Sequence, residues 1–433
     1  MRVLWFTNVA TPQMLRHANR PEGTGGGHWI NELAHHVTGM TCIELGIATA
    51  AADLPYARFD EEGIRFYVLP QPRRILRAAM RKADLENCLS AIEDFGPDLI
   101  HVHGSERFFG MIKAADLTSV PMLISVQGLL SAFSRARHFF GALSGLEIAR
   151  SLRVLELPLR IGLAWYFFDA KMGAKREAAM FAAADAVIGR TQWDQTHTHV
   201  YNDRAPYFHV GEILRSPFYR TRWSLDACDR HSVIYTNVGH PSRGTEDLLA
   251  AVALLRSEFP RIKLRLAGRI SARGGYGRFV RKRIRGLGIA DCVELLDYVN
   301  GEAVAAALAR SHVFAITSYI ENSPNSLGEA MLVGMPCVAS YVGGIPSLVH
   351  DHDTGLFFPP GDVPLLAERI GRLFREDATA VRLGANAHSA ARGRYDPETV
   401  VRELMAAYEA VVGERRTEGE ALSQNGRSRA RAG

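Results

Sequence analysis

The stretch Glu321-Asn-Ser-Pro-Asn-Ser-Leu-Gly-Glu329 continues into Ala330-Met-Leu-Val-Gly-Met-Pro-Cys-Val-Ala-Ser340 and Tyr341-Val-Gly-Gly-Ile-Pro346. Its turn and cap residues, 324–326, precede a pattern from Leu327 to Val333 that predicts a helix. The unpaired amides of a first helical turn, together with the helix dipole, form a site suited to a phosphate. The two flanking glutamates would repel a phosphate unless they accept hydrogen bonds from neutral hydroxyls. A ligand that carries both groups is a sugar nucleotide.

A structural interpretation of the same stretch is open. Ser326 and Glu329 fit a capping box, in which the hydroxyl and the carboxylate bind amides of the first helical turn. Glu321 would then be a solvated carboxylate. The glycines that follow favour a ligand site, because Gly343 and Gly344 come shortly after a predicted strand, and glycine allows a ligand to approach the backbone closely.

The segment resembles the E-x7-E donor site of glycosyltransferase family 4, with Glu321 and Glu329 as the two glutamates. The similarity continues through Asp353-Thr-Gly355-Leu-Phe-Phe-Pro-Pro-Gly-Asp362, although His352 stands where glycine is usual in the family. The resemblance implies an α/β protein with the GT-B fold, in which two Rossmann-like, doubly wound domains face a central cleft. It also implies a retaining enzyme that uses a nucleotide-diphosphate sugar as donor.

The length and composition limit the class of protein. At 433 residues the chain can form two domains with substantial cores, and 47% hydrophobic with 22% charged residues is typical of a soluble globular protein. The net charge of +5 fits phosphate ligands or an anionic membrane surface and does not by itself argue for nucleic acid. Five scattered cysteines favour reduced thiols in the cytoplasm. We see no signal peptide and no apolar run of about twenty residues that could span a membrane.

Short apolar runs alternate with helical patterns, which predicts parallel sheets covered by helices. We predict an N-terminal domain over 1–211, a hinge over 212–230 and a C-terminal domain over 231–395. A final helix over 396–413 would, by resemblance, cross back to the first domain, and the polar tail 414–433 is predicted to be disordered. The predicted strands are Val3–Val9, Thr41–Gly46, Arg65–Leu69, Leu99–Val102, Met122–Val126, Ala186–Ile188, Val233–Val238, Lys263–Leu266, Val293–Leu295, Val313–Ile316 and Cys337–Ala339.

The residues after the strand Val233–Val238 should face the cleft from the donor side. The family usually places an arginine and a lysine here to hold the donor diphosphate, and by resemblance His240 and Arg243 occupy these two positions. Arg243 can form charge-assisted bonds to phosphate oxygens, whereas His240 would have to be protonated to act as a cation. The alternative for Arg243 is a surface arginine near a helix start, which is an unfavourable position for a cation.

Three positions of the N-terminal half resemble the family's residues near the reacting groups. Gly26 and Gly27, in the glycine-rich loop after the first strand, resemble a loop that approaches the donor phosphate and the acceptor. Gln127 stands before Gly128, where many members carry histidine near the reactive carbon of the sugar. Glutamine can donate and accept hydrogen bonds but cannot act as a base.

Two further residues are expected on the acceptor side of the cleft, each with a structural alternative. His103 follows the buried strand Leu99–Val102 and should reach the edge of the cleft, although a histidine at a strand end is more often structural. Arg190 follows the strand Ala186–Ile188 and should lie on a loop that faces the cleft. The alternative there is a helix cap formed by Thr191 and Asp194.

The segment 131–175 combines basic residues with apolar and aromatic ones. This composition suits an interfacial helix that reaches a lipid-linked acceptor at the inner face of the cytoplasmic membrane. Helices that cover the N-terminal sheet would have a similar composition, so both interpretations stand.

These observations lead to one hypothesis and two rivals. A retaining glycosyltransferase would transfer a sugar to a glycan or lipid-linked acceptor in polysaccharide synthesis. Glu329 would bind ribose hydroxyls and Glu321 the transferred sugar, with no cofactor, no metal and no protein nucleophile required. The phosphate would be bound by the amides of Asn325, Ser326 and Leu327. The rivals are another GT-B chemistry, such as an inverting transferase or an epimerase, and a catalytically silent protein that binds sugar nucleotides.

Overall fold

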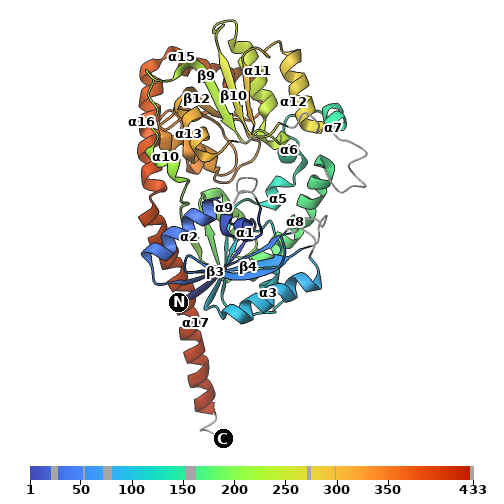
Figure 1. The fold of residues 1–433 in the computed structure, drawn as a ribbon, viewed down its shortest axis with the longest axis vertical. Helices are drawn as coiled ribbons and strands as arrows, with labels where there is room; N and C mark the ends of the chain where they lie inside the picture. Colours follow the sequence, from blue (N-terminus) through green and yellow to red (C-terminus); the bar gives the residue numbers. More distant parts are fainter. Residues whose placement is uncertain are drawn as a thin grey trace.

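The computed structural model describes residues 1–20, 28–51, 54–71, 80–151, 162–270, 275–297 and 299–429 of the chain. It contains two α/β domains, one above the other in Figure 1, and a long C-terminal helix that packs along the N-terminal domain. Each domain is built on its own sheet, of eight strands in the N-terminal domain and six in the C-terminal domain. The predicted α/β class with two doubly wound domains is confirmed.

The N-terminal sheet has the strand order β3-β4-β2-β1-β5-β6-β7-β8, and its pairs are parallel except that β3 runs antiparallel to β4. Helices α2 and α17 lie over one face, and α3, α4 and α8 lie over the other. The strands are β1 (Arg2–Thr7), β2 (Glu44–Ala51), β3 (Ala57–Glu61), β4 (Ile64–Pro70), β5 (Leu99–His103), β6 (Met122–Ser125), β7 (Ala186–Gly189) and β8 (Tyr207–His209). The helices are α1 (Pro12–His17), α2 (His28–Met40), α3 (Lys82–Phe95), α4 (Met111–Ala114), α5 (Leu130–Phe133), α6 (Ala136–Phe139), α7 (Gly145–Ser151), α8 (Leu163–Ala183) and α9 (Gln192–His199).

The C-terminal sheet is parallel, with the order β11-β10-β9-β12-β13-β14. Its strands are β9 (Asp229–Thr236), β10 (Lys263–Ala267), β11 (Val293–Asp297), β12 (Ser311–Ile316), β13 (Cys337–Ser340) and β14 (Leu356–Phe358). Its helices are α10 (Ser216–Arg220), the short 3₁₀ helices η2 (Pro241–Arg243) and η3 (Ile345–Ser347), α11 (Thr245–Leu255), α12 (Gly275–Gly286), α13 (Gly301–Ala309), α14 (Asn325–Val333), α15 (Val363–Arg375) and α16 (Asp377–Arg394). The last helix, α17 (Pro397–Arg429), packs on the N-terminal domain.

The strands that the sequence did not reveal are β3, β8 and β14. Two of them are only three residues long, which is too short for a periodic pattern to stand out. The predicted hinge also differs in detail. Its α10 packs on the C-terminal domain, where Phe218 is fully buried in the core, and Trp223 donates a hydrogen bond to the carbonyl of Ser311 at 2.8 Å.

Helix α17 joins the two domains. Val400, Leu404 and Tyr408 are buried in the core of the N-terminal domain, and the Tyr408 hydroxyl accepts a hydrogen bond from Trp5 Nε1 at 2.9 Å. We predicted that this helix ends near residue 413 and that a disordered tail follows. Its backbone instead stays helical to Arg429, and residues 414–429 contain several glutamates and arginines, which favour a helix, and no proline.

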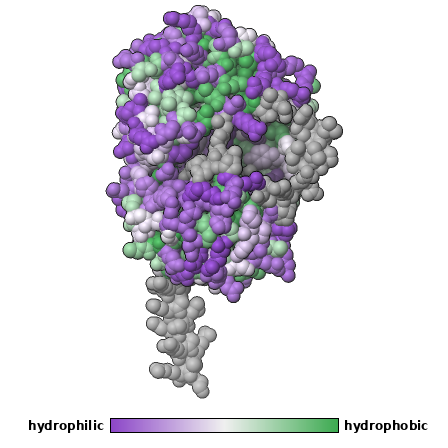
Figure 2. Space-filling view, viewed as in Figure 1, coloured by the Kyte–Doolittle hydropathy of each residue, from purple (hydrophilic) through white to green (hydrophobic). Residues whose placement is uncertain are grey.

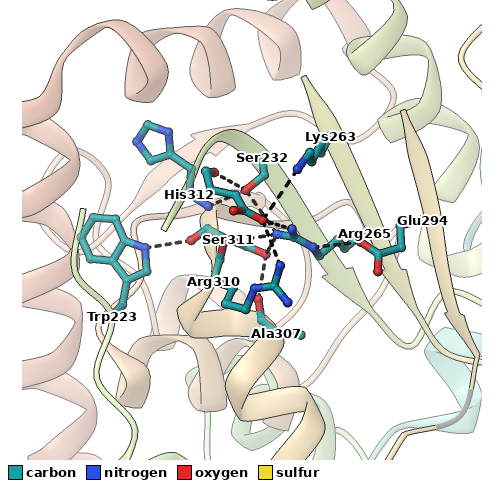
Figure 3. Close-up of polar contacts among 10 residues, drawn as sticks. Trp223, Ser232, Lys263, Arg265, Glu294, Ala307, Arg310, Ser311 and His312 are labelled. Atoms are coloured by element: carbon teal, nitrogen blue, oxygen red, sulfur yellow. Dashed lines mark hydrogen bonds and ion pairs between the residues drawn. The ribbon is translucent and has the colours of Figure 1, made fainter. Parts of the chain in front are cut away.

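An ionic cluster around one buried arginine lies near the amino ends of β9 and β12 in the C-terminal domain (Figure 3). At its centre Arg265, whose side chain is 4% exposed, forms ion pairs with Asp229 and Glu294. Its guanidinium also donates to the carbonyl of Arg310 at 3.2 Å and to Ser311 Oγ at 3.0 Å. These contacts satisfy the guanidinium inside the domain, so the cluster is structural.

The carboxyl ends of the parallel strands in both domains border the space between them, where ligands of such folds bind. The segment that contains α5 and α6 reaches across from the N-terminal domain. Leu143 belongs to the C-terminal core, and a Cβ on Gly141 (φ 59°) would lie 2.7 Å from the carbonyl oxygen of Pro241. No described helix is long and apolar enough to cross a membrane, and the face in Figure 2 is mostly hydrophilic with smaller apolar patches.

Candidate active site

Two neighbouring cavities lie at the carboxyl ends of the strands. The α14 cavity, of about 450 Å³, is lined mainly by the C-terminal domain and by Trp29 of α2. The η2 cavity, of about 570 Å³, lies between the domains. Asn237, Gly268 and Arg269 line both, so the two cavities share a wall at the ends of β9 and β10. Asn237 has a φ of 65°, an uncommon conformation outside glycine that is often found at functional sites.

The start of α14 borders the α14 cavity, as the sequence predicted. Pro324 is the N-cap and makes no side-chain cap, so the proposed capping box of Ser326 with Glu329 does not form. Among the described residues the amides of Asn325 and Ser326 have no hydrogen-bond partner, and both residues line the cavity. Leu327 differs, because its amide donates to the carbonyl of Pro324 at 3.0 Å and its side chain is buried in the core. Two amides, rather than three, are therefore available to a phosphate.

Glu329 lines the α14 cavity and is held by an arginine that the sequence did not single out. Arg215 Nε and Nη2 both donate to Glu329 Oε1, at 2.9 and 2.7 Å. Burial raises the pKa of Glu329 to about 7, the Arg215 guanidinium opposes this, and the Glu212 carboxylate adds to it. Oε2 of Glu329 accepts no hydrogen bond from the described residues, so it can accept one from a ligand hydroxyl.

Arg243 and Glu321 both line the η2 cavity, and the structure brings them into direct contact. Arg243 Nη1 forms an ion pair with Glu321 Oε1, which also accepts a hydrogen bond from Ser318 Oγ at 2.7 Å. Both side chains remain partly accessible, at 24% and 11%. A bound anion and a bound sugar could therefore each reach one member of the pair.

Gly343 and Gly344 do not line either cavity. A Cβ on Gly343 (φ 50°) would lie 1.9 Å from the carbonyl oxygen of Glu321, and one on Gly344 would lie 2.3 Å from that of Asn322. The Gly344 amide donates to the Glu321 carbonyl at 3.1 Å. The two glycines thus hold the backbone of the Glu321 loop, and their contact with the donor stays a prediction.

His240 cannot serve as the cation that its position suggested. Burial and the nearby Arg243 lower its pKa to about 3, so the ring is neutral at physiological pH. It packs against the rings of Phe133, Phe139 and Tyr166. Because Nδ1 accepts a hydrogen bond from the Ser242 amide at 3.2 Å, the proton is on Nε2. That atom has no partner among the described residues.

On the N-terminal side, Gln127 lines the η2 cavity together with Glu106, Gly128 and Trp193. Gln127 thus lies opposite Arg243 and Glu321, where a histidine was expected by resemblance. The predicted loop residues Gly26 and Gly27 lie outside the described part of the chain.

His103 and Arg190 do not line the α14 or the η2 cavity. Both line a smaller cavity of about 30 Å³, together with Trp29 of the α14 cavity and Gln127 of the η2 cavity. His103 is 1% exposed and packs against Trp5, Trp29 and His101. His101 and His103 point to the same face of β5 because side chains alternate along a strand. Burial, followed by the charges of His101 and Arg190, lowers the pKa of His103 well below its usual value.

Arg190 is buried and forms an ion pair with Glu212, and its Nη2 donates to the carbonyl of Val126 at 3.1 Å. The helix-cap alternative is the one that the structure contains. Thr191 and Asp194 form a capping box at the start of α9. Arg190 thus has structural contacts, and its acceptor-side role stays a prediction.

Sequence reasoning missed Arg215, Glu106 and Arg269. Arg215 lies in a hinge stretch without a periodic pattern, so nothing marked it as the partner of Glu329. Glu106 and Arg269 each follow a buried strand, β5 and β10, and line the η2 cavity. Position after a strand was the available signal, and at β5 it pointed to His103 and not to Glu106, which lies three residues further along the chain.

Two protein-family models match the chain. The model described as "Glycosyl transferases group 1" matches residues 225–390. The model described as "Glycosyl transferase 4-like domain" matches residues 24–193. The two matches fall on the C-terminal and N-terminal domains respectively.

Similar curated proteins include two transferases. The chain is 33% identical over 173 residues to the MMP alpha-(1->4)-mannosyltransferase of Mycolicibacterium hassiacum, which covers 40% of this chain and 41% of that protein. It is 31% identical over 166 residues to the D-inositol 3-phosphate glycosyltransferase of Corynebacterium efficiens, which covers 37% of this chain and 39% of that protein. The chain thus spans about two fifths of the length of these relatives.

Solved structures resemble the whole chain. The sucrose-phosphate synthase of Thermosynechococcus elongatus superposes with a TM-score of 0.74 at 18% identity, covering 96% of this chain and all of that one. HepE of Anabaena in a complex with UDP-glucose superposes with a TM-score of 0.66 at 17% identity, covering 95% of this chain and all of that one. At these identities the likeness concerns the fold, and it confirms the GT-B arrangement.

Proposed function

The chain belongs to glycosyltransferase family 4, and from this premise we propose that it transfers a sugar from a nucleotide-diphosphate sugar to a glycan or lipid-linked acceptor. The observation that carries the proposal is the shared wall of the α14 and η2 cavities. One cavity holds the unpaired amides of α14 and the accessible oxygen of Glu329. The other holds Arg243 and Glu321, so a single extended ligand can use all four.

The nucleotide end of the donor fits the α14 cavity. Ribose hydroxyls would donate to Glu329 Oε2, and the amides of Asn325 and Ser326 would bind a phosphate oxygen at the positive end of the helix dipole. Arg215 keeps the carboxylate in place through Oε1, which leaves Oε2 for the ligand. The diphosphate would then pass the shared wall toward Arg243.

The sugar end fits the η2 cavity, between Glu321 and Gln127. We propose that the bond from the sugar carbon to the leaving phosphate oxygen breaks while the acceptor oxygen bonds to that carbon from the same face. The proton of the acceptor hydroxyl passes to a leaving phosphate oxygen, so this step uses no protein nucleophile. Arg243 would stabilise the negative charge that grows on the diphosphate, and retention of the anomeric configuration follows from same-face attack.

Glu329→Gln tests the site. The amide keeps the size of the side chain but disrupts both the Arg215 pair and the ribose contact, so we expect turnover of the donor to be abolished while the fold stays intact. Turnover is measured as release of nucleoside diphosphate across a panel of sugar nucleotides, with circular dichroism as the control for folding. Glu368→Gln, an exposed carboxylate on α15, is the matched control. Near wild-type turnover in Glu329→Gln would show that the site is assigned wrongly, and NMR of the product anomer tests retention.

We further propose a peripheral membrane contact, through part of the segment predicted for it. Phe168 and Met172 lie one turn apart on α8 with exposed fractions of 50% and 46%, and Lys171 and Lys175 are exposed beside them. Apolar and basic side chains together suit an anionic membrane surface. Residues 152–161 of the segment lie outside the described part, and Phe139 of α6 packs inward against His240.

Flotation with anionic liposomes tests this contact and with it a location at the inner face of the cytoplasmic membrane. We expect the purified protein to float with the liposomes and the double variant Phe168→Ser, Met172→Ser to stay behind. Val381→Ser, which removes a similarly exposed apolar side chain from α16, should float like the wild type. Absence of the wild-type protein from the liposome fraction would end the idea.

A further inference from the structure

A second carboxyl group faces the η2 cavity from the N-terminal domain. Glu106 follows β5 and lines the cavity beside Gln127 and Gly128. Its Oε1 lies toward Gly128, where an added Cβ would be 3.5 Å away. The roles assigned above to the donor do not use this residue, since Glu321 and Glu329 both belong to the other domain.

The position of Glu106 is fixed on several sides. Asn8 Nδ2 donates a hydrogen bond to Glu106 Oε2, and Arg176 Nη2 donates to its backbone carbonyl at 2.9 Å. Gly104 (φ 93°) makes room for this arrangement, because a Cβ there would lie 2.2 Å from Glu106 Oε2 and 2.3 Å from Asn8 Nδ2. The carboxyl group is therefore built into the cavity wall.

A neighbouring carboxylate supports the same wall from behind. Glu177 of α8 accepts hydrogen bonds from Ser105 Oγ at 2.6 Å and from the amides of Leu130 and Ser131 at 2.8 and 2.9 Å. These bonds tie the loop after β5 to the loop after β6. Glu177 does not line the cavity, so it positions the wall, whereas Glu106 faces the space inside.

The N-terminal wall of the η2 cavity has a chemistry of its own. Its other lining residues are apolar or aromatic, namely Leu129, Leu130, Phe133, Tyr166 and Trp193. Flat apolar side chains suit the C–H faces of a sugar ring. The described lining residues that carry a positive charge, Arg243 and Arg269, come from the C-terminal domain, where the proposed donor diphosphate needs them. If the acceptor carried an anionic group beside Glu106, the carboxylate of Glu106 would repel it. No described lining residue of the N-terminal domain carries a positive charge that could offset this repulsion.

We propose that Glu106 accepts a hydrogen bond from the attacking hydroxyl of the acceptor, and that the acceptor presents a neutral sugar ring at this wall. The inference rests on the proposed function, because it assigns the acceptor half of the same reaction. Glu106 orients the hydroxyl toward the sugar carbon, and the proton still passes to the leaving phosphate oxygen.

The charge state of Glu106 gives the assignment a measurable signature. Burial raises the pKa of Glu106 to about 7, the Glu177 carboxylate adds to the rise, and the Arg190 guanidinium opposes it. Arg176 is a further cation packed against the loop. Because the carboxylate accepts hydrogen bonds better than the neutral acid, kcat/KM for the acceptor at saturating donor should rise with pH up to about 7 and level off above it.

Glu106→Gln is the direct test. We expect kcat/KM for the acceptor to fall about tenfold to hundredfold, the range for loss of a hydrogen bond to a charged group, and its rise with pH to disappear. The affinity for nucleoside diphosphate, measured by calorimetry, should stay within about twofold, because the α14 cavity is unchanged. Glu44→Gln, an exposed carboxylate of the same domain, is the matched control. A panel of neutral sugars against uronic acids and sugar phosphates tests the class of acceptor.

The outcomes separate this inference from the proposed function. If the wild type turns over no sugar nucleotide, the proposed function fails. If the wild type transfers and Glu106→Gln keeps its acceptor kcat/KM and its pH profile, the inference fails alone. Preference for anionic acceptors would overturn the assignment of a neutral sugar. If Glu106→Gln does not fold, Asn8→Ala is the second test, because it removes the hydrogen bond that holds the Glu106 carboxyl group in place. We expect Asn8→Ala to lower acceptor kcat/KM by a smaller factor. An unchanged value would contradict the inference.

Discussion

Arginine–carboxylate pairs occur at both ends of the C-terminal sheet, and their surroundings differ. Near the amino ends of the strands, Arg265 is 4% exposed and donates to side chains and to a carbonyl of its own domain. At the carboxyl ends, Arg243 and Arg215 are 24% and 28% exposed and each binds one glutamate. The cavity-facing arginines keep N–H groups without partners among the described residues.

The difference teaches how one kind of ion pair can serve two purposes. A guanidinium that is satisfied inside the protein contributes to stability only, because it has nothing left to offer a ligand. One that faces a cavity with spare donors can bind an anion, while the carboxylate beside it keeps it in position without a ligand. Substitution of a cavity-facing arginine should therefore lower activity more than stability. Substitution of Arg265 should lower stability more than activity.

The largest effect is expected at the cavity end. Arg243→Met should lower transfer by about 10²–10³-fold, because the growing charge on the diphosphate loses its main stabilising group. The unfolding free energy should fall by only about 1–2 kcal/mol, because Glu321 loses one partner but keeps its hydrogen bond from Ser318. Steady-state kinetics and thermal unfolding measure the two quantities. If Arg243→Met transferred sugar as fast as the wild type, the donor diphosphate would not bind at Arg243.

At the amino ends of the strands, substitution should lower stability and leave ligand binding unchanged. Arg265→Met should destabilise the C-terminal domain by about 2–4 kcal/mol, because Ser311 Oγ and the Arg310 carbonyl lose a buried donor and Asp229 keeps only the more exposed Lys263 and Arg310. Folded protein should still bind nucleotide as the wild type does. Urea unfolding followed by tryptophan fluorescence measures the change. Arg310→Ala, at the 69% exposed edge of the cluster, is the control and should cost less than about 1 kcal/mol; a larger loss than for Arg265→Met would contradict the comparison.

The smallest effect concerns pH at the cavity end. Glu329, with its pKa raised to about 7 by burial, holds a proton below that pH and must lose it to accept hydrogen bonds from ribose through a carboxylate. The affinity for an intact sugar nucleotide should therefore rise about tenfold between pH 6 and pH 8. Calorimetry over this range measures it. Glu329→Gln should bind weakly at every pH, and an equally steep rise in that variant would assign the proton to another group.

Most residues predicted for the proposed donor half do line the two cavities. The glutamate pair, Arg243 and the start of α14 were marked by short, continuous motifs whose spacing alone brings their residues to one strand edge. His352 shows a tolerated departure, since it adopts a φ of 62° where the family usually has glycine. The roles of Gly343 and Leu327 were less predictable, because they depend on which side of a loop or helix faces the cavity.

The surroundings of His103 and Arg190, predicted for the acceptor half, could not be read from the sequence. His103 and Arg190 lie at strand ends, as expected, but side chains at a strand end can point to either face or back into the core. Their partners come from distant parts of the chain, with Trp5 packed on His103 and Glu212 paired with Arg190. No local pattern carries that information.

The sequence by itself determined the two α/β domains, the family resemblance and the donor motif, because apolar periodicity and continuous motifs are local properties of the chain. Only the tertiary structure decided that Arg215 holds Glu329, that Arg243 contacts Glu321 and that Glu106 faces the same cavity. These contacts join residues 78 to 114 positions apart or set residues of different domains face to face. Their formation depends on how the sheets and loops pack, and packing is set by the whole chain at once.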